Sequence, residues 1–176
     1  MNFNLIISTF RHHEEEAYNE ILDILNGAGD LEAQAEVSDI IGIVLGFTRI
    51  DPFQVIQLFR KLMIDNPWEI RYILRLLPIE TVGPTQLEYI ISNAKRLALK
   101  IKKHETFRIT VEKRHTSLSS WHVIKAVGGS IDNKVDLEKP DWIVLVEIVG
   151  RETGISVLRP NQIFSSVIEK RKFSTS

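Results

Sequence analysis

The sequence predicts a mixed α/β (α+β) fold in two domains, of which the first has the element order βαββαβ. Short apolar segments alternate with longer ones in which apolar residues recur at helical spacing. Loop-forming residues at Thr81-Val82-Gly83-Pro84 interrupt this alternation and mark the boundary between the two halves. A composition of 44% apolar and 26% charged residues is that of an ordinary globular protein.

The first half combines four short strands with two helices. Its expected strands are residues 3–9, 35–37, 41–47 and 71–77. A helix over residues 13–26 has glutamates in its first turn, where they favour the helix dipole, and Gly27 ends it. Asp51 followed by Pro52 predicts the start of the second helix, with a capping aspartate and proline at the first helical position. The resulting order predicts a ferredoxin-like domain over residues 1–80.

The second half begins with the clearest helix, residues 84–102, in which apolar residues keep one face. A short helix starts at Ser119 or Ser120 and ends at Gly128-Gly129. The expected strands are residues 106–114, 142–149 and 155–158, of which the second is almost continuously apolar, as in a central buried strand. We assign residues 81–165 to the second domain. A short amphipathic helix beyond Pro160 and a basic tail over residues 166–176 complete the chain.

Charge is distributed unevenly along the chain, although its net value is only −1. Residues 95–125 contain nine Lys/Arg and two acids, 9 − 2 = +7, whereas residues 1–70 contain four Lys/Arg and twelve acids, 4 − 12 = −8. We therefore expect a polyanion to be drawn to one face of the protein only.

The sequence lacks the signature motifs of most enzyme classes. The chain has no cysteine, which excludes disulfides, thiolate zinc sites and thiol nucleophiles. Glycine-rich nucleotide loops, the nucleophile elbow and the zinc-protease helix motif are also absent from the sequence. We therefore expect a protein without catalytic activity or cofactor. No apolar segment is long enough for a signal peptide or membrane span, so we expect a cytoplasmic location and no membrane partner.

Two groups of residues suggest metal or acid–base chemistry, and each has a structural alternative that we favour. His12 and His13 precede glutamates, but adjacent rings cannot share a helix face, which favours a solvated helix start. Asp132, Asp136 and Asp141 are possible acid–base groups or Mg²⁺ ligands. They lie in a loop that leads into a buried strand, where turn and cap roles are more common.

The basic strand over residues 107–115 is the main candidate for a binding site. Alternation places Arg108 and Arg114 together on one face, with Lys113 and His115 at the rim. A serine-rich loop then leads into a helix N-terminus, which presents unpaired N–H groups to a phosphate. Trp121 and His122 follow and could stack on a base, although for Trp121 taken alone we favour packing in the core, the usual role of aromatic residues.

At these residues the chain resembles the THUMP domain, a module of RNA-modifying enzymes. The resemblance covers roughly residues 75–160. It rests on residues 107–115 (FRITVEKRH), 135–137 (VDL), 139–141 (KPD), 144–148 (VLVEI) and 154–157 (GISV). Residues 37–47 and 75–79 further resemble the stand-alone THUMP proteins that assist tRNA cytidine acetylation.

This resemblance implies a ferredoxin-like domain followed by a THUMP domain that binds the acceptor stem and 3′ end of tRNA. Asp136, Pro140 and Asp141 are structural in that fold. The RNA-binding residues that we predict are Arg108, Lys113, Arg114, His115, Ser117, Ser120, Trp121, Lys125, Lys100 and Lys103. In most relatives the domain is fused to a methyltransferase, thiouridine synthetase or pseudouridine synthase. With the chain ending at Ser176, we expect no such domain here.

The leading hypothesis is therefore a non-catalytic tRNA-binding adaptor for a separate enzyme, most simply a tRNA acetyltransferase that forms N4-acetylcytidine. A second hypothesis is a subunit of another tRNA modification enzyme for methylation, thiolation or pseudouridylation, whose carboxylates act only within a complex. A third, based on fold analogy alone, is a small-ligand sensor built on the ferredoxin-like half.

Overall fold

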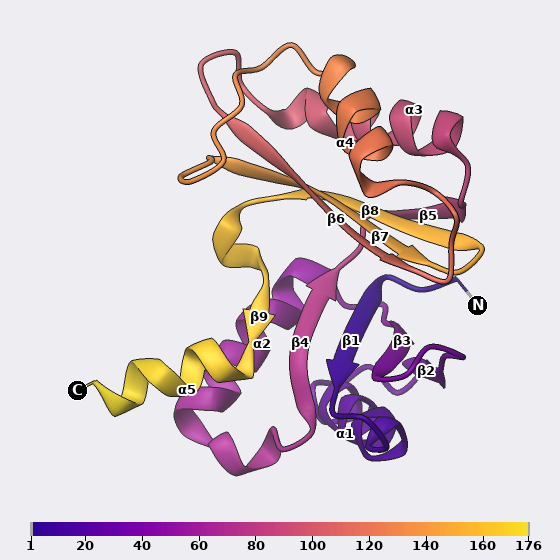
Figure 1. The fold of residues 1–176 in the computed structure, drawn as a ribbon. Helices are drawn as coiled ribbons and strands as arrows, with labels where there is room; N and C mark the ends of the chain where they lie inside the picture. The colour runs from indigo at the N-terminus through magenta and orange to yellow at the C-terminus, as the bar shows by residue number, and fades with distance from the viewer. Residues whose placement is uncertain (1, 176) are drawn as a thin grey trace. The chain divides into compact units, whose positions relative to one another are not determined.

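Two β-sheets, each with its own helices, organise this structure, a computed structural model that describes residues 2–175 (Figure 1). The first sheet belongs to unit 1, which contains residues 1–79 and 161–176, and the second belongs to unit 2, residues 80–160. No helix within residues 2–175 has both the length and the apolar character needed to cross a membrane.

Unit 1 has an antiparallel sheet in the order β2-β3-β1-β4-β9. Its strands are β1 (Leu5–Thr9), β2 (Gln34–Val37), β3 (Ile43–Phe47), β4 (Ile73–Pro78) and β9 (Phe164–Ser165). Its helices are α1 (Glu14–Gly27), α2 (Pro52–Asp65), α5 (Ser166–Ser174) and the 3₁₀ turn η1 (Pro67–Glu69). Apart from the 3₁₀ turn η1, the elements from β1 to β4 follow the predicted order βαββαβ, and apolar residues of α1 and α2 form one core with the strands.

Local chemistry explains where α2 begins. The Asp51 carboxylate accepts a hydrogen bond from the backbone N–H of Phe53 at 2.9 Å, and Pro52 takes the first helical position. Phe59 and Met63 then fall on the buried face of the helix, one turn apart. The cap and the spacing therefore set both the start of α2 and the face that it buries, as the sequence predicts.

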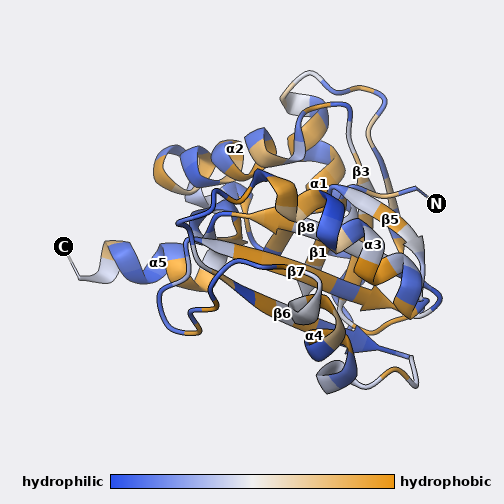
Figure 2. Ribbon diagram, turned by 90° about the horizontal axis from the view of Figure 1, so that it is seen from above, coloured by the Kyte–Doolittle hydropathy of each residue, from blue (hydrophilic) through white to orange (hydrophobic). Residues whose placement is uncertain are grey.

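Unit 2 has a mixed sheet in the order β5-β8-β7-β6, in which only β6 and β7 are parallel. Its strands are β5 (Thr81–Pro84), β6 (Phe107–Arg114), β7 (Trp142–Val149) and β8 (Glu152–Leu158). Its helices are α3 (Leu87–Leu97), the 3₁₀ turn η2 (Ala98–Lys100) and α4 (Ser120–Gly129), and η3 (Pro160–Gln162) follows the sheet. Strand β7 is the central buried strand that the sequence predicts. Most of it has the colour of apolar residues in Figure 2, and all its residues after Trp142 are buried.

The predicted loop at the domain boundary is a strand instead. Residues 81–84 form β5, which pairs with β8 so that Thr81 faces Ile155 and Pro84 faces Glu152. The Tyr89 ring packs directly against Gly83, and a Cβ at this position would lie 2.2 Å from its Cζ, so a larger residue would require the ring to shift. Glycine and proline normally indicate a loop, but at the edge of a sheet the missing side chain and N–H are tolerated.

The C-terminal segment also differs from the prediction, which assigned residues up to 165 to the second domain and the rest to a tail. The two-residue strand β9 pairs with β4, and Phe164 is buried with its ring 5.3 Å from that of Phe59. Residues 166–174 form helix α5, whose Glu169 makes an ion pair with Arg60 at 3.2 Å. Residues 161–176 consequently belong to unit 1, because long-range pairing and packing hold them there.

Glu105 makes the stability of unit 2 depend on pH. Its carboxylate accepts hydrogen bonds from the Lys102 N–H at 3.0 Å and from Arg159 Nη1 at 2.7 Å, and these lower its pKa from 4.5 to about 2. Because the folded-state pKa is depressed, the stabilisation is complete above about pH 4.5 and is lost as the pH falls towards 2. We predict that the free energy of unfolding falls less in Glu105→Gln than in wild type between about pH 4.5 and pH 2.

Urea unfolding at pH values from 2 to 6 measures this difference, with Glu138→Gln as the matched control. Glu138 is exposed, and its side chain makes no ion pair among the described residues. Identical pH slopes for wild type and Glu105→Gln would contradict the prediction.

Candidate nucleic-acid interface

Strand β6 lies at the edge of the unit 2 sheet and has the two faces that its alternation predicts. Phe107 is buried in the core cluster of this unit with residues of α3 and α4, and the partly buried Ile109 and Val111 pack against that cluster. The parallel pairing with β7 sets the register, in which Lys113 lies opposite Ile148. Lys113 is exposed, and its ammonium donates to the carbonyl oxygen of Leu118 at 3.2 Å.

The polar face of β6 is more enclosed than the alternation suggests. Arg114 Nη1 lies 2.8 Å from Glu147 Oε2, in an ion pair whose carboxylate side chain is fully buried and whose arginine side chain is 18% exposed. Arg108 donates through Nη1 to the Leu137 carbonyl at 3.3 Å, and its Nε is buried without a partner among the described residues. Arg114 is therefore occupied by a structural contact, while Arg108 retains an unused donor.

A hollow of about 460 Å³ lies where β6 ends. Three segments form it: the connection from β5 to α3, the loop after β6 and the turn from β7 to β8. Its lining consists of Pro84, Thr85, Gln86, His115, Thr116, Ser117, Gly150 and Arg151.

Hydrogen bonds hold these three segments together. Thr85 donates from its hydroxyl to the Gly150 carbonyl and from its backbone N–H to the Arg151 carbonyl, both at 2.9 Å. The Gly150 N–H in turn donates to the Arg114 carbonyl at 2.9 Å. Because of these bonds the hollow is part of the folded unit and does not have to be assembled by a ligand.

The chemistry of the hollow suits an anion. Arg151 contributes a guanidinium, His115 an imidazole, and Ser117 and Thr116 contribute hydroxyl groups. Helix α3 begins at this point, and Gln86 makes no side-chain cap hydrogen bond to its first turn. Guanidinium, hydroxyl and helix N–H groups are the donors that proteins use for phosphate.

Arg151 is a site residue that sequence reasoning did not find. It follows Gly150, which adopts a positive φ of 62°, and the sequence pattern there predicts only a turn. Nothing in the local sequence connects Arg151 to His115, which lies 36 positions earlier. The only available signal was a lone arginine at the tip of an expected hairpin.

Trp121 is exposed rather than packed in the core, with 61% of its surface accessible. Ser119 caps α4 by accepting from the His122 N–H at 3.4 Å, so Trp121 lies in the first turn. Lys125 follows one turn later and places its ammonium 4.8 Å from the centre of the indole. The His122 ring also lies 5.4 Å from the indole, and the accessible part of Trp121 offers a surface to a stacking partner.

The predicted RNA-binding residues do not form one continuous patch. His115 and Ser117 line the hollow after β6, whereas Lys100 and Lys103 precede β6. An eight-residue strand is about 26 Å long, which separates these two groups. Lys100 is also bound to the Glu80 carboxylate at 2.7 Å and to the Val157 carbonyl at 2.9 Å, while Lys103 is exposed.

Structural roles account for two of the three aspartates considered above for acid–base or metal chemistry, and the third, Asp132, is exposed. Asp136 accepts from the N–H groups of Glu138 and Lys139, both at 3.0 Å, and these bonds lower its pKa. Asp141 accepts from the Thr106 N–H at 2.8 Å. Within residues 2–175, no group of three or more His, Asp or Glu is placed to hold a metal ion.

Comparison with known proteins identifies a THUMP domain in unit 2. Residues 84–158 match the family model described as the THUMP domain. THUMP domain-containing protein 1 of Bos taurus is 32% identical over 103 residues, which are 53% of this chain and 29% of that protein. The predicted THUMP domain is therefore confirmed for this segment, while the chain spans less than a third of its curated relative.

Solved structures of similar fold cover most of the chain. The similar proteins include PH1313 from Pyrococcus horikoshii Ot3, with 19% identity, a TM-score of 0.67 and coverage of 90% of this chain and 55% of that chain. TrmN from Thermus thermophilus has 20% identity, a TM-score of 0.57 and coverage of 89% and 46%. A 4-thiouridine synthetase in complex with RNA and ATP has 13% identity, a TM-score of 0.54 and coverage of 89% and 41%. At these identities the likeness concerns the fold alone.

The ion pair at the end of β6 leads to a prediction about stability. We expect Arg114→Ala to lower the unfolding free energy by about 3 kcal/mol, because it leaves the buried Glu147 carboxylate without its arginine. Arg151→Ala removes the same kind of side chain from an exposed position, and we expect a change within about 0.5 kcal/mol. Thermal and urea unfolding of the two variants measure the difference, and equal losses would contradict the structural role of Arg114.

Proposed function

We propose that the protein binds tRNA through unit 2 and acts as a non-catalytic adaptor for a separate tRNA-modifying enzyme. The observation that carries this proposal is the phosphate-compatible hollow within the segment that matches the THUMP domain. In this proposal the acceptor stem and 3′ end of tRNA lie against that face, and the partner is an acetyltransferase that forms N4-acetylcytidine.

The geometry supports contacts to the RNA backbone and to one base. Lys113 and Arg151 are exposed cations at the end of β6, and His115 and Ser117 lie beside Arg151 in the lining of the hollow. Phosphate contacts of this kind give affinity that does not depend on base sequence. Trp121 supplies an aromatic surface on which an unpaired base, such as one at a 3′ end, stacks.

The names of similar proteins support RNA as the ligand class. A 4-thiouridine synthetase with the same fold was crystallised in complex with RNA, and THUMP domain-containing protein 1 is related in sequence. The resemblance of residues 37–47 and 75–79 to stand-alone THUMP proteins supports cytidine acetylation as the reaction that is assisted.

The absence of activity in the protein itself is also part of the proposal. Asp136 and Asp141 are used as hydrogen-bond acceptors for backbone N–H groups, which is a structural task. The sequence carries none of the nucleotide-binding or nucleophile motifs that modification enzymes use. The described residues therefore offer donors for binding tRNA, and the chemistry is left to the partner.

Removing two cations beside the hollow tests RNA binding. We predict that Lys113→Ala/Arg151→Ala binds tRNA about tenfold more weakly than wild type near physiological salt, because two phosphate contacts are lost. The slope of log affinity against log salt should become shallower by about two. Fluorescence anisotropy or filter binding at several salt concentrations gives both quantities.

The matched control is Lys102→Ala/Lys134→Ala, which removes the same charge from two exposed lysines near the start of β6 that are not among the predicted RNA-binding residues. We expect this control to bind within about twofold of wild type, since net charge alone has only a long-range, screened effect. An equal loss in both variants would show attraction by overall charge and contradict the proposed position of the site.

Reconstitution tests the adaptor role. We predict that the protein alone, mixed with tRNA, acetyl-CoA and ATP, forms no N4-acetylcytidine, whereas adding it to a tRNA acetyltransferase of the same organism raises the yield. Lys113→Ala/Arg151→Ala should lose this stimulation. Nucleoside analysis by mass spectrometry measures the product. Two results would contradict this role: formation of N4-acetylcytidine by the protein alone, or an acetyltransferase whose yield does not change when the protein is added.

A further inference from the structure

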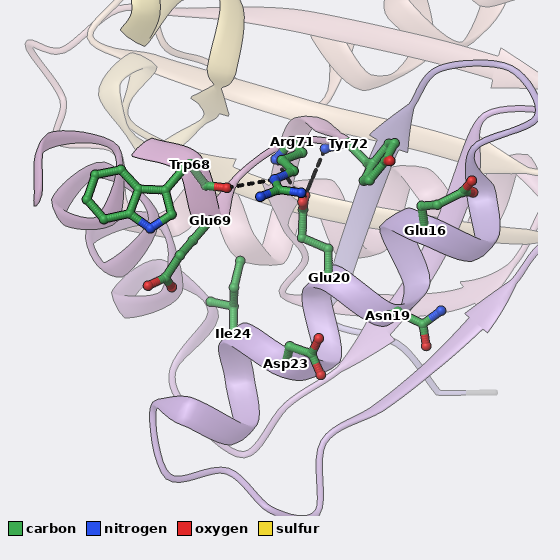
Figure 3. A pocket seen from close by; sticks show the side chains of 9 residues that line it. All are labelled: Glu16, Asn19, Glu20, Asp23, Ile24, Trp68, Glu69, Arg71 and Tyr72. Carbon is green, nitrogen blue, oxygen red and sulfur yellow. Dashed lines mark hydrogen bonds between the residues drawn. The ribbon is translucent and has the colours of Figure 1, made fainter. Parts of the chain in front are cut away.

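Unit 1 contains a second hollow, of about 520 Å³, that the proposed RNA binding does not use (Figure 3). Helix α1 forms one wall, and η1 with the two residues just before β4 forms the other. The lining consists of Glu16, Asn19, Glu20, Asp23, Ile24, Trp68, Glu69, Arg71 and Tyr72. We refer to it as the Trp68 hollow.

Glu20 joins the two walls of the Trp68 hollow. Its carboxylate accepts backbone N–H bonds from Arg71 at 2.7 Å, Tyr72 at 3.1 Å and Ile73 at 2.8 Å. Arg71 Nε donates in turn to the carbonyl oxygen of Trp68 at 3.0 Å, as Figure 3 shows. These bonds fix the chain on both sides of the hollow, so that an incoming group meets a preformed surface.

Trp68 is exposed although it is the largest apolar side chain in the lining. Its exposed fraction is 62%, and it does not belong to the buried core cluster of unit 1. Ile24 and Tyr72 provide further apolar surface in the same hollow. An exposed indole beside a concave surface is typical of the residues that dominate protein–protein contacts.

The charge in the Trp68 hollow favours a cation. The lining has four carboxylates and one guanidinium, a net charge of −3, and most of it belongs to residues 1–70, whose net charge is −8. Among the described residues, the side chains of Asp23 and Glu69 take part in no ion pair, so both carboxylates remain open to a new partner. An ammonium or guanidinium placed here gains charge pairing and, over the indole, a cation–π contact.

We propose that the Trp68 hollow docks a lysine- or arginine-bearing segment of a partner protein. The aromatic surface accepts the aliphatic stem of such a side chain, and the carboxylates accept its charged end. Nucleic acid does not fit the same surface, because phosphates are repelled by the carboxylates. This inference goes beyond RNA binding, since it concerns a protein contact in a different unit of the chain.

Peptide binding to the full-length protein tests the inference. The probe is a fluorescein-labelled peptide of alternating glycine and arginine with three arginines, and a peptide with glutamate in place of arginine is the comparator. We expect the arginine peptide to bind in fluorescence anisotropy and the glutamate peptide not to bind. Trp68→Ala and Asp23→Asn/Glu69→Gln should each weaken binding about tenfold.

The matched control is Glu36→Gln/Asp39→Asn, which removes two exposed carboxylates of unit 1 outside the hollow. We expect it to bind the arginine peptide within about twofold of wild type. Equal weakening in the control would mean attraction by the overall acidic charge, and unchanged binding by Trp68→Ala would mean that the indole is not used. Either result overturns the inference.

Binding of tRNA by the same variants separates this inference from the proposed RNA site. Trp68→Ala should bind tRNA as wild type does, because the cations of the candidate interface are untouched. A loss of tRNA binding in Trp68→Ala would assign the hollow to RNA and overturn the inference of a protein contact. If Lys113→Ala/Arg151→Ala binds tRNA as tightly as wild type, the proposed RNA site is contradicted, while the inference about the Trp68 hollow still stands.

Discussion

The parallel pairing of β6 with β7 is the constraint on which the candidate interface depends. Two parallel strands require a crossover, which α4 provides, so the chain must leave β6 through a loop and enter a helix. The carboxyl ends of both strands then lie at the same edge of the sheet. The loop that contains His115 and the turn that contains Arg151 meet there, and antiparallel β5 brings the start of α3 to the same edge. The hollow is thus a consequence of topology.

The same pairing explains why one arginine of β6 is structural. Glu147 on β7 is fully buried, and a buried carboxylate needs a close cation. Arg114 on the neighbouring strand supplies it at 2.8 Å. The number of Lys and Arg residues in this part of the sequence is therefore larger than the number of cations available to a ligand at the surface. Lys100 illustrates the same point, because its ammonium is bound by Glu80.

The two halves of the chain differ in charge and also in the kind of hollow that they contain. Unit 2 combines cations with hydroxyl groups and a helix N-terminus, which suits phosphate. Unit 1 combines carboxylates with an exposed indole, which suits a cationic side chain. This division supports the proposed adaptor role, in which RNA and a protein partner bind to different units of the chain.

The sequence by itself determined the elements whose signals are local. Capping by Asp51 and Ser119, the helical spacing of α2 and the alternation of β6 depend on neighbouring residues, and the structure agrees with each of them. Only the tertiary structure decided the features that join distant segments. The strands β5 and β9 exist because β8 and β4 pair with them, Arg151 reaches the hollow through sheet topology, and Arg114 is occupied by a residue 33 positions away. Hydrogen-bond partners and buried charges of this kind are set by contacts across the sheet, which no local pattern records.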